Sequence, residues 1–103
     1  MSWAAPHIAK LAKGETIQFR PSGNSMEPRI PNRALVTVAP ARNFEGFRKG
    51  DIVLCRVKGR YYLHFIQAVQ QKMNATLYQI GNASGHTNGW TSQIYGKVTR
   101  VEK

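Results

Sequence analysis

Short apolar or alternating segments, separated by turn residues, make up most of this chain, and helical periodicity is nearly absent. Residues 7–13 are long enough for a helix of about two turns that ends before Gly14. The remaining apolar segments predict β-strands at residues 16–20, 34–39, 52–57, 61–69, 76–80 and 94–101. The pattern therefore predicts a mainly β domain, built as a single coiled antiparallel sheet or partly open barrel with a short N-terminal helix.

Two connections carry turn signals. Residues 57–61 predict a tight hairpin in which Gly59 has a positive φ, and residues 48–51 predict a turn that leads into a buried strand. The glycine-bounded segment 81–89 is expected to be a loop with His86 at the surface. Of Trp3 and Trp90, at least one is expected in the core.

The length of 103 residues favours one domain, 1–103, in which residues 1–14 form an N-terminal extension. No apolar run is long enough to span a membrane and no secretory signal opens the chain, so we expect a cytoplasmic protein without a membrane partner. The single Cys55 is expected to be buried and inert. Three histidines and one cysteine show no metal-ligand spacing, so neither a metal nor another cofactor is expected.

The net positive charge of the chain indicates an acidic partner. Fifteen Lys and Arg against five Asp and Glu give a net charge of +10, and scattered cations that include Arg56, Lys58 and Arg60 suit a surface that attracts a nucleic acid or an acidic protein. The same cations equally suit a solvated surface. Tyr61 and Tyr62 beside them resemble a base-stacking pattern, although neighbours on a strand point to opposite faces.

The strongest candidate for chemistry is the turn at residues 23–28, Gly-Asn-Ser-Met-Glu-Pro. Gly23 and Asn24 tolerate unusual backbone angles, Met26 can anchor the turn from below, and Pro28 fixes its exit. This arrangement is suited to presenting Ser25 as a nucleophile. The alternative is a turn with a purely structural role, which is common for a Ser or an Asn in such a position.

The order of four short motifs resembles the superfamily of signal peptidases and LexA-like serine peptidases. Residues 25–28 look like its S-M-x-P nucleophile motif, and residues 49–53 (Lys-Gly-Asp-Ile-Val) are similar to its G-D-I-V strand opening. Residues 62–66 align with the strand that carries the general base, and residues 80–84 with 94–98 are similar to its closing loop and final strand. The closing segment looks most like that of small phage and prophage members, which implies the cytoplasm of a bacterial host.

The resemblance implies acyl transfer by Ser25 with His64 as the general base, where many members have a Lys. The backbone N–H groups of Asn24 and Ser25 would form the oxyanion hole, and Met26 would border the substrate. Because a carboxylate third member looks absent, Asn82, Asn88 or a backbone carbonyl would orient the imidazole. A buried His with no catalytic role is the alternative for His64.

Two functions therefore stay open. Residues 1–24 contain neither an Ala-Gly nor a Cys-Gly bond, so self-cleavage of the family type is not expected. The first hypothesis is therefore a peptidase that cuts another protein in trans after a small side chain. The second is an inactive domain that binds a peptide strand or an acidic partner through its basic surface. Pairing of two copies, as in LexA-like dimers, is left open.

Overall fold

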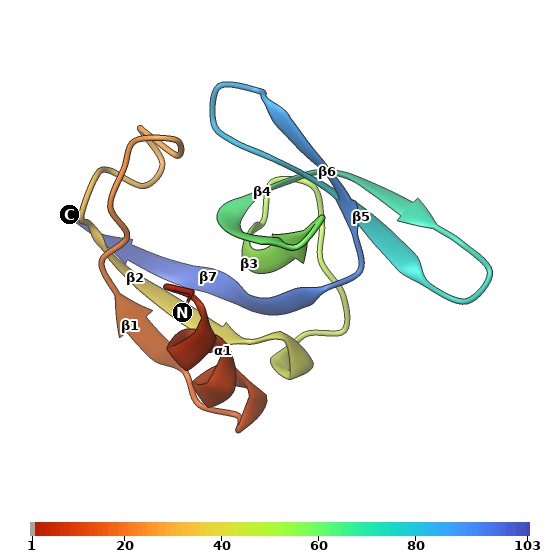
Figure 1. Cartoon of the computed structure of the whole chain (residues 1–103), viewed down its shortest axis with the longest axis horizontal. Helices are drawn as coiled ribbons and strands as arrows, with labels where there is room; N and C mark the ends of the chain where they lie inside the picture. The colour runs from red at the N-terminus through yellow and green to blue at the C-terminus, as the bar shows by residue number, and fades with distance from the viewer. Residues whose placement is uncertain (1) are drawn as a thin grey trace.

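The computed structural model describes residues 2–103 and forms one seven-stranded sheet in the order β1-β2-β7-β3-β4-β5-β6 (Figure 1). All neighbouring strands are antiparallel, and β1 and β6 form the two edges, so the sheet is open. The strands are β1 (Ile17–Phe19), β2 (Leu35–Pro40), β3 (Ile52–Val57), β4 (Arg60–Gln71), β5 (Thr76–Gly81), β6 (Thr87–Thr91) and β7 (Ile94–Glu102). The mainly β prediction, with one coiled and incompletely closed sheet, is confirmed.

The N-terminal helix α1 spans Ala5–Ala12 and packs onto β1, β2 and β7 through the buried Leu11 (Figure 1). It begins two residues earlier than the predicted 7–13, because Pro6 fits the first turn of a helix, where its missing N–H costs no hydrogen bond. A short 3-10 turn, η1 (Ala41–Asn43), follows β2. No helix within residues 2–103 is long and apolar enough to cross a membrane.

Strand β6 corrects the sequence analysis, which placed residues 81–89 in a loop. It pairs with β5 in a register that sets Ile80 opposite Gly89 and Gln79 opposite Trp90. Thr-Asn-Gly-Trp-Thr has no alternating apolar pattern, and Gly89 has a φ of 140°. The pairing with β5, a tertiary contact, therefore makes this segment a strand.

The predicted hairpin and turn are both present. Lys58 and Gly59 have φ values of 51° and 83° between β3 and β4, as a tight hairpin of this twist requires. Gly50 has a φ of 96°, and the Asp51 carboxylate accepts a hydrogen bond from the Arg48 N–H at 2.9 Å. Both turns fix the entry of their strands into the sheet.

Two apolar clusters form the core. The larger joins α1 to β1 and β2 and also includes Ile52 and Leu54 of β3 and Leu63 of β4. The smaller is built on the alternate residues of β3 together with β4 and β5. Cys55 is buried in the smaller cluster, and burial raises the pKa of its thiol to about 12. The expectation that Cys55 is buried is confirmed.

The prediction that at least one tryptophan lies in the core is wrong. Trp3 is 49% exposed and Trp90 is 42% exposed. Trp3 precedes α1 and Trp90 lies on the edge strand β6, and at both positions the indole is covered only in part.

Candidate active site

The connection between β1 and β2 presents Ser25. Gly23, with a φ of 105°, donates its backbone N–H to Asn32 Oδ1 at 2.7 Å, which closes the turn from outside. Met26 is only 5% exposed and packs in the larger apolar cluster, while the Ile30 N–H donates to the Met26 carbonyl at 2.9 Å. The anchored Met26 thus holds the turn, and the neighbouring Ser25 is left exposed.

Strand β4 positions His64. The residue pairs with Val53 on β3 and is 8% exposed. Tyr62, two residues earlier and hence on the same face of the strand, stacks on the imidazole with ring centroids 5.0 Å apart and planes 30° apart. Strand pairing and stacking together restrict the orientation of the His64 ring.

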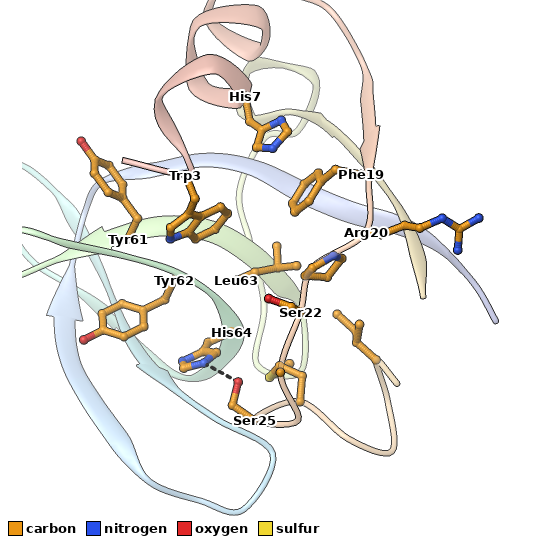
Figure 2. Close-up of a pocket in the computed structure, with 14 residues that line it drawn as sticks. Trp3, His7, Phe19, Arg20, Ser22, Ser25, Tyr61, Tyr62, Leu63 and His64 are labelled. Carbon is orange, nitrogen blue, oxygen red and sulfur yellow. Dashed lines mark hydrogen bonds between the residues drawn. The ribbon is translucent and has the colours of Figure 1, made fainter. Parts of the chain in front are cut away.

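Ser25, His64 and Asn88 form a chain of side-chain contacts. Ser25 Oγ lies 3.2 Å from His64 Nε2, and His64 Nδ1 lies 2.7 Å from Asn88 Oδ1 (Figure 2 shows the first contact). With the amide oxygen as acceptor, Nδ1 carries the hydrogen and Nε2 is free to accept from the serine hydroxyl. That tautomer is the one a general base needs.

Burial lowers the pKa of His64 below its ordinary value of 6.5, because the charged imidazolium is poorly solvated at this position. The hydrogen bond to Asn88 acts in the opposite direction, and the nearby His86 adds to the lowering. The imidazole is therefore neutral at neutral pH and has its proton-accepting nitrogen beside Ser25.

Comparison with known proteins identifies the family of the chain. A family model described as Peptidase S24-like matches residues 3–78, which is most of the chain and includes both Ser25 and His64. The chain belongs to the S24-like peptidase family. Comparison with curated proteins and with solved structures gives no match. The resemblance to LexA-like peptidases is thereby confirmed, whereas the phage or prophage type stays a prediction.

The closing loop of this S24-like domain braces the nucleophile turn. The Ala83 N–H donates to the Ser25 carbonyl at 2.9 Å. Asn82 Oδ1 accepts from the Ser84 and His86 backbone N–H groups at 3.1 and 3.0 Å. Asn82 thus organises the loop, and of the two asparagines expected to orient His64, it is Asn88 that contacts the ring. His86 is exposed, as expected.

The basic residues singled out from the sequence gather at the β3–β4 turn of the S24-like domain. Arg56 lies with its guanidinium 5.1 Å from the centre of the Tyr61 ring, while Lys58 and Arg60 are exposed. The cation that borders the cavity beside Ser25 is a different one, Arg20, whose side chain points away from the aromatic residues (Figure 2).

A cavity of about 400 Å³ opens beside the Ser25–His64 pair and is bordered by Met26. Sequence analysis did not identify the aromatic side chains that form its other walls; these are Trp3, His7, Phe19, Tyr61 and Tyr62. Trp3 and His7 come from the N-terminal extension, so the spacing along the chain gives no sign that they approach Ser25. Within residues 2–103, no group of three or more metal-ligating side chains is present.

Proposed function

We propose that this S24-like protein is a serine peptidase that cleaves another protein in trans, with Ser25 as nucleophile and His64 as general base. The single observation that supports this proposal is the continuous contact from Ser25 Oγ through the imidazole to Asn88 Oδ1, at 3.2 and 2.7 Å. A serine in a merely structural turn has no need of a base held in the correct tautomer. We assign Asn88 as the positioning residue.

The proposed reaction has two acyl-transfer steps. Ser25 Oγ attacks the substrate carbonyl while its proton passes to His64 Nε2, and the developing oxyanion is assigned to the backbone N–H groups of Asn24 and Ser25. The imidazolium then gives this proton to the departing amine, which breaks the peptide bond and leaves an acyl group on Ser25. Water, deprotonated by the same imidazole, releases the acid and restores the hydroxyl.

The sheet offers a place for an extended substrate. Strand β4 pairs with β3 through residues 60–65 but with β5 only through residues 65–71. The edge of β4 beside His64 therefore lacks a neighbouring strand over residues 60–64, and a peptide that adds there brings its backbone alongside Ser25. This supports a protein or peptide as the substrate class. The cytoplasmic location stays a prediction from the sequence.

A binding module without catalysis is the second candidate. The observation that favours it is the group of Arg56, Lys58 and Arg60 at the β3–β4 turn, in a chain with a net charge of +10. Such a surface attracts acidic proteins or nucleic acid, and its affinity falls steeply as salt rises. This function requires neither Ser25 nor His64.

Covalent labelling with a serine-directed phosphonate tests the peptidase. We expect wild-type labelling at Ser25, none in Ser25→Ala, and a loss of roughly 10²–10⁴-fold in rate in His64→Ala. Because the pKa of His64 is lowered, the labelling rate should rise with pH only in the acidic range and be level from neutral pH upward. The position of the label is read by mass spectrometry of peptides, and the rate by intact mass against time.

Two matched variants serve as controls. Ser92 is exposed and distant from the dyad in sequence, and His86 is exposed, so Ser92→Ala and His86→Ala should retain labelling. Removal of the imidazole at residue 86 should move the labelling profile slightly toward higher pH, because His86 contributes to the lowered pKa of His64. Folded wild-type protein that is unlabelled across the whole pH range would reject the peptidase and leave the binding module.

A further inference from the structure

The cavity beside Ser25 has walls that the proposed chemistry does not use. Its floor is apolar and buried, formed by Met26, Ile30 and Leu63. Its rim is aromatic: His7 stacks on Phe19 with ring centroids 4.2 Å apart. Proton transfer between Ser25 and His64 needs none of these side chains. The buried floor also belongs to the core, whereas the aromatic rim is available to a group that binds next to the nucleophile.

The N-terminal extension supplies one wall of this cavity. Trp3 lies 6.2 Å from Phe19 and 6.4 Å from His7 between ring centroids, and it lines the same cavity as Tyr61 and Tyr62 of β4. The indole is 49% exposed. A half-exposed tryptophan at the rim gains further burial when an apolar group enters, which favours binding of that group.

The size of the cavity favours some substrate side chains over others. A volume of about 400 Å³ lies within the range of pockets that enclose whole small molecules. A methyl group such as that of alanine fills little of this volume and leaves the aromatic walls in contact with water. A leucine, methionine or phenylalanine side chain reaches both the buried floor and the aromatic rim.

We propose that this cavity is a subsite for a large apolar side chain on the acyl side of the bond that Ser25 attacks, with Trp3 as a specificity-determining residue. The assignment of the acyl side rests on the proposed peptidase function. It differs from the small side chain that the family resemblance implies. The wall formed by Trp3 and His7 is also neutral at neutral pH, since burial, together with the charge of Lys10, lowers the pKa of His7.

Inhibition by a matched pair of peptide aldehydes tests the subsite in the active protein. Acetyl-Ala-Ala-phenylalaninal should compete with phosphonate labelling of Ser25 roughly tenfold or more better than acetyl-Ala-Ala-alaninal. Trp3→Ala should remove most of this difference. Trp90→Ala should preserve it, because Trp90 is similarly exposed, at 42%, but does not border the cavity. Circular dichroism verifies that both variants are folded.

A binding measurement that needs no catalysis separates the two proposals. In the Ser25→Ala, Trp90→Phe double variant, Trp3 is the remaining tryptophan, and its emission is titrated with acetyl-Ala-Ala-Phe-amide or with acetyl-Ala-Ala-Ala-amide. A response to the Phe peptide at concentrations where the Ala peptide gives none supports the subsite. If labelling by phosphonate succeeds but neither aldehydes nor amides discriminate, the subsite is rejected and the peptidase stands. If labelling fails but the Phe peptide binds, the peptidase is rejected and the apolar subsite stands.

Discussion

At the scale of single residues, the distinctive feature of the proposed catalytic site is an amide where serine peptidases with a histidine commonly use a carboxylate. Asn88 Oδ1 accepts from His64 Nδ1 and so fixes the ring and its tautomer. An uncharged amide stabilises the imidazolium less than a carboxylate does, so burial dominates and the pKa of His64 is lowered. In the proposed mechanism, the lowered pKa keeps the imidazole neutral at neutral pH but also makes it a weaker base for the serine proton.

Substitution of Asn88 tests this positioning role. Asn88→Ala removes a hydrogen bond that becomes charge-assisted when the imidazole is protonated, a bond worth about 1.5–3 kcal/mol, so phosphonate labelling should slow roughly tenfold to a hundredfold. Asn88→Asp should recover much of the rate and raise the apparent pKa of the labelling profile, because a carboxylate favours the imidazolium. The measurement is the labelling rate against pH for each variant.

Asn82 provides the matched control for this prediction. Its side chain accepts hydrogen bonds from Ser84 and His86 within the loop, so Asn82→Ala should reduce thermal stability. It should not lower the apparent pKa of the labelling profile, as Asn88→Ala should by removing the hydrogen bond that raises the pKa of His64. An unchanged rate and pH profile in Asn88→Ala would show that the contact with His64 has no role in the chemistry.

At the scale of secondary structure elements, β6 matters most for the site because it carries Asn88. It pairs with β5, and Thr91 Oγ1 at its end donates to the Arg56 carbonyl of β3 at 2.6 Å. A Cβ on Gly89 would lie 3.1 Å from Val57 Cγ1, so the strand also lies close against β3. An edge strand fixed at both points can hold a side chain in the position that a catalytic contact requires.

The close approach of β7 to α1 and β2 gives a prediction about stability. A Cβ on Gly96 would lie 2.7 Å from both the Ala39 carbonyl oxygen and Val38 Cγ1, and 3.1 Å from Leu11 Cδ1. Since the carbonyl belongs to the backbone of β2, the strands must separate to admit it. Gly96→Ala should lower the free energy of unfolding by about 1–3 kcal/mol, measured by urea denaturation.

Gly46→Ala is the matched comparison for Gly96→Ala. Its added Cβ would meet only the Tyr78 hydroxyl, at 4.0 Å, so stability should change by no more than about 0.5 kcal/mol. Equal stability of the two variants would contradict the tight packing of β7 beneath α1.

At the scale of the whole molecule, positive charge is largely uncompensated. Among residues 2–103 the ion pairs are Lys97–Asp51 at 3.4 Å and Arg100–Glu102 at 3.3 Å, while the net charge of the chain is +10. The remaining cations create a long-range positive potential that attracts acidic molecules and is screened by salt. In the proposed peptidase, this field would act on the encounter with a substrate and not on the acyl-transfer step itself.

Charge removal at the β3–β4 turn tests that contribution. The triple variant Arg56→Gln, Lys58→Gln, Arg60→Gln should lower the rate of labelling by an acidic peptidyl phosphonate relative to a neutral one, because these cations steer acidic probes. The same ratio in the wild type should fall as salt rises from about 50 to 200 mM. A ratio that responds neither to salt nor to the variant would show that the positive surface has no part in substrate capture.

The sequence by itself determined the features that depend on neighbouring residues. Short apolar or alternating segments set six of the strands, Gly59 and Gly50 set two turns, and the Gly-Asn-Ser-Met turn presented Ser25 with Met26 beneath it. Each depends on local backbone preference or on which face of one segment is apolar, and both can be read along the chain. The family resemblance was likewise contained in short motifs.

Only the tertiary structure decided which distant residues meet. His64 lies 39 residues from Ser25 and 24 from Asn88, and the choice of Asn88 over Asn82 depends on β6, whose sequence has no strand pattern. The exposure of Trp90 follows from its place on the edge strand β6, and the approach of Trp3 to the cavity follows from how α1 packs on the sheet. Strand register and helix docking are set by the summed burial of many side chains, and a shift of one residue turns each side chain to the opposite face, so these contacts exist only in the folded whole.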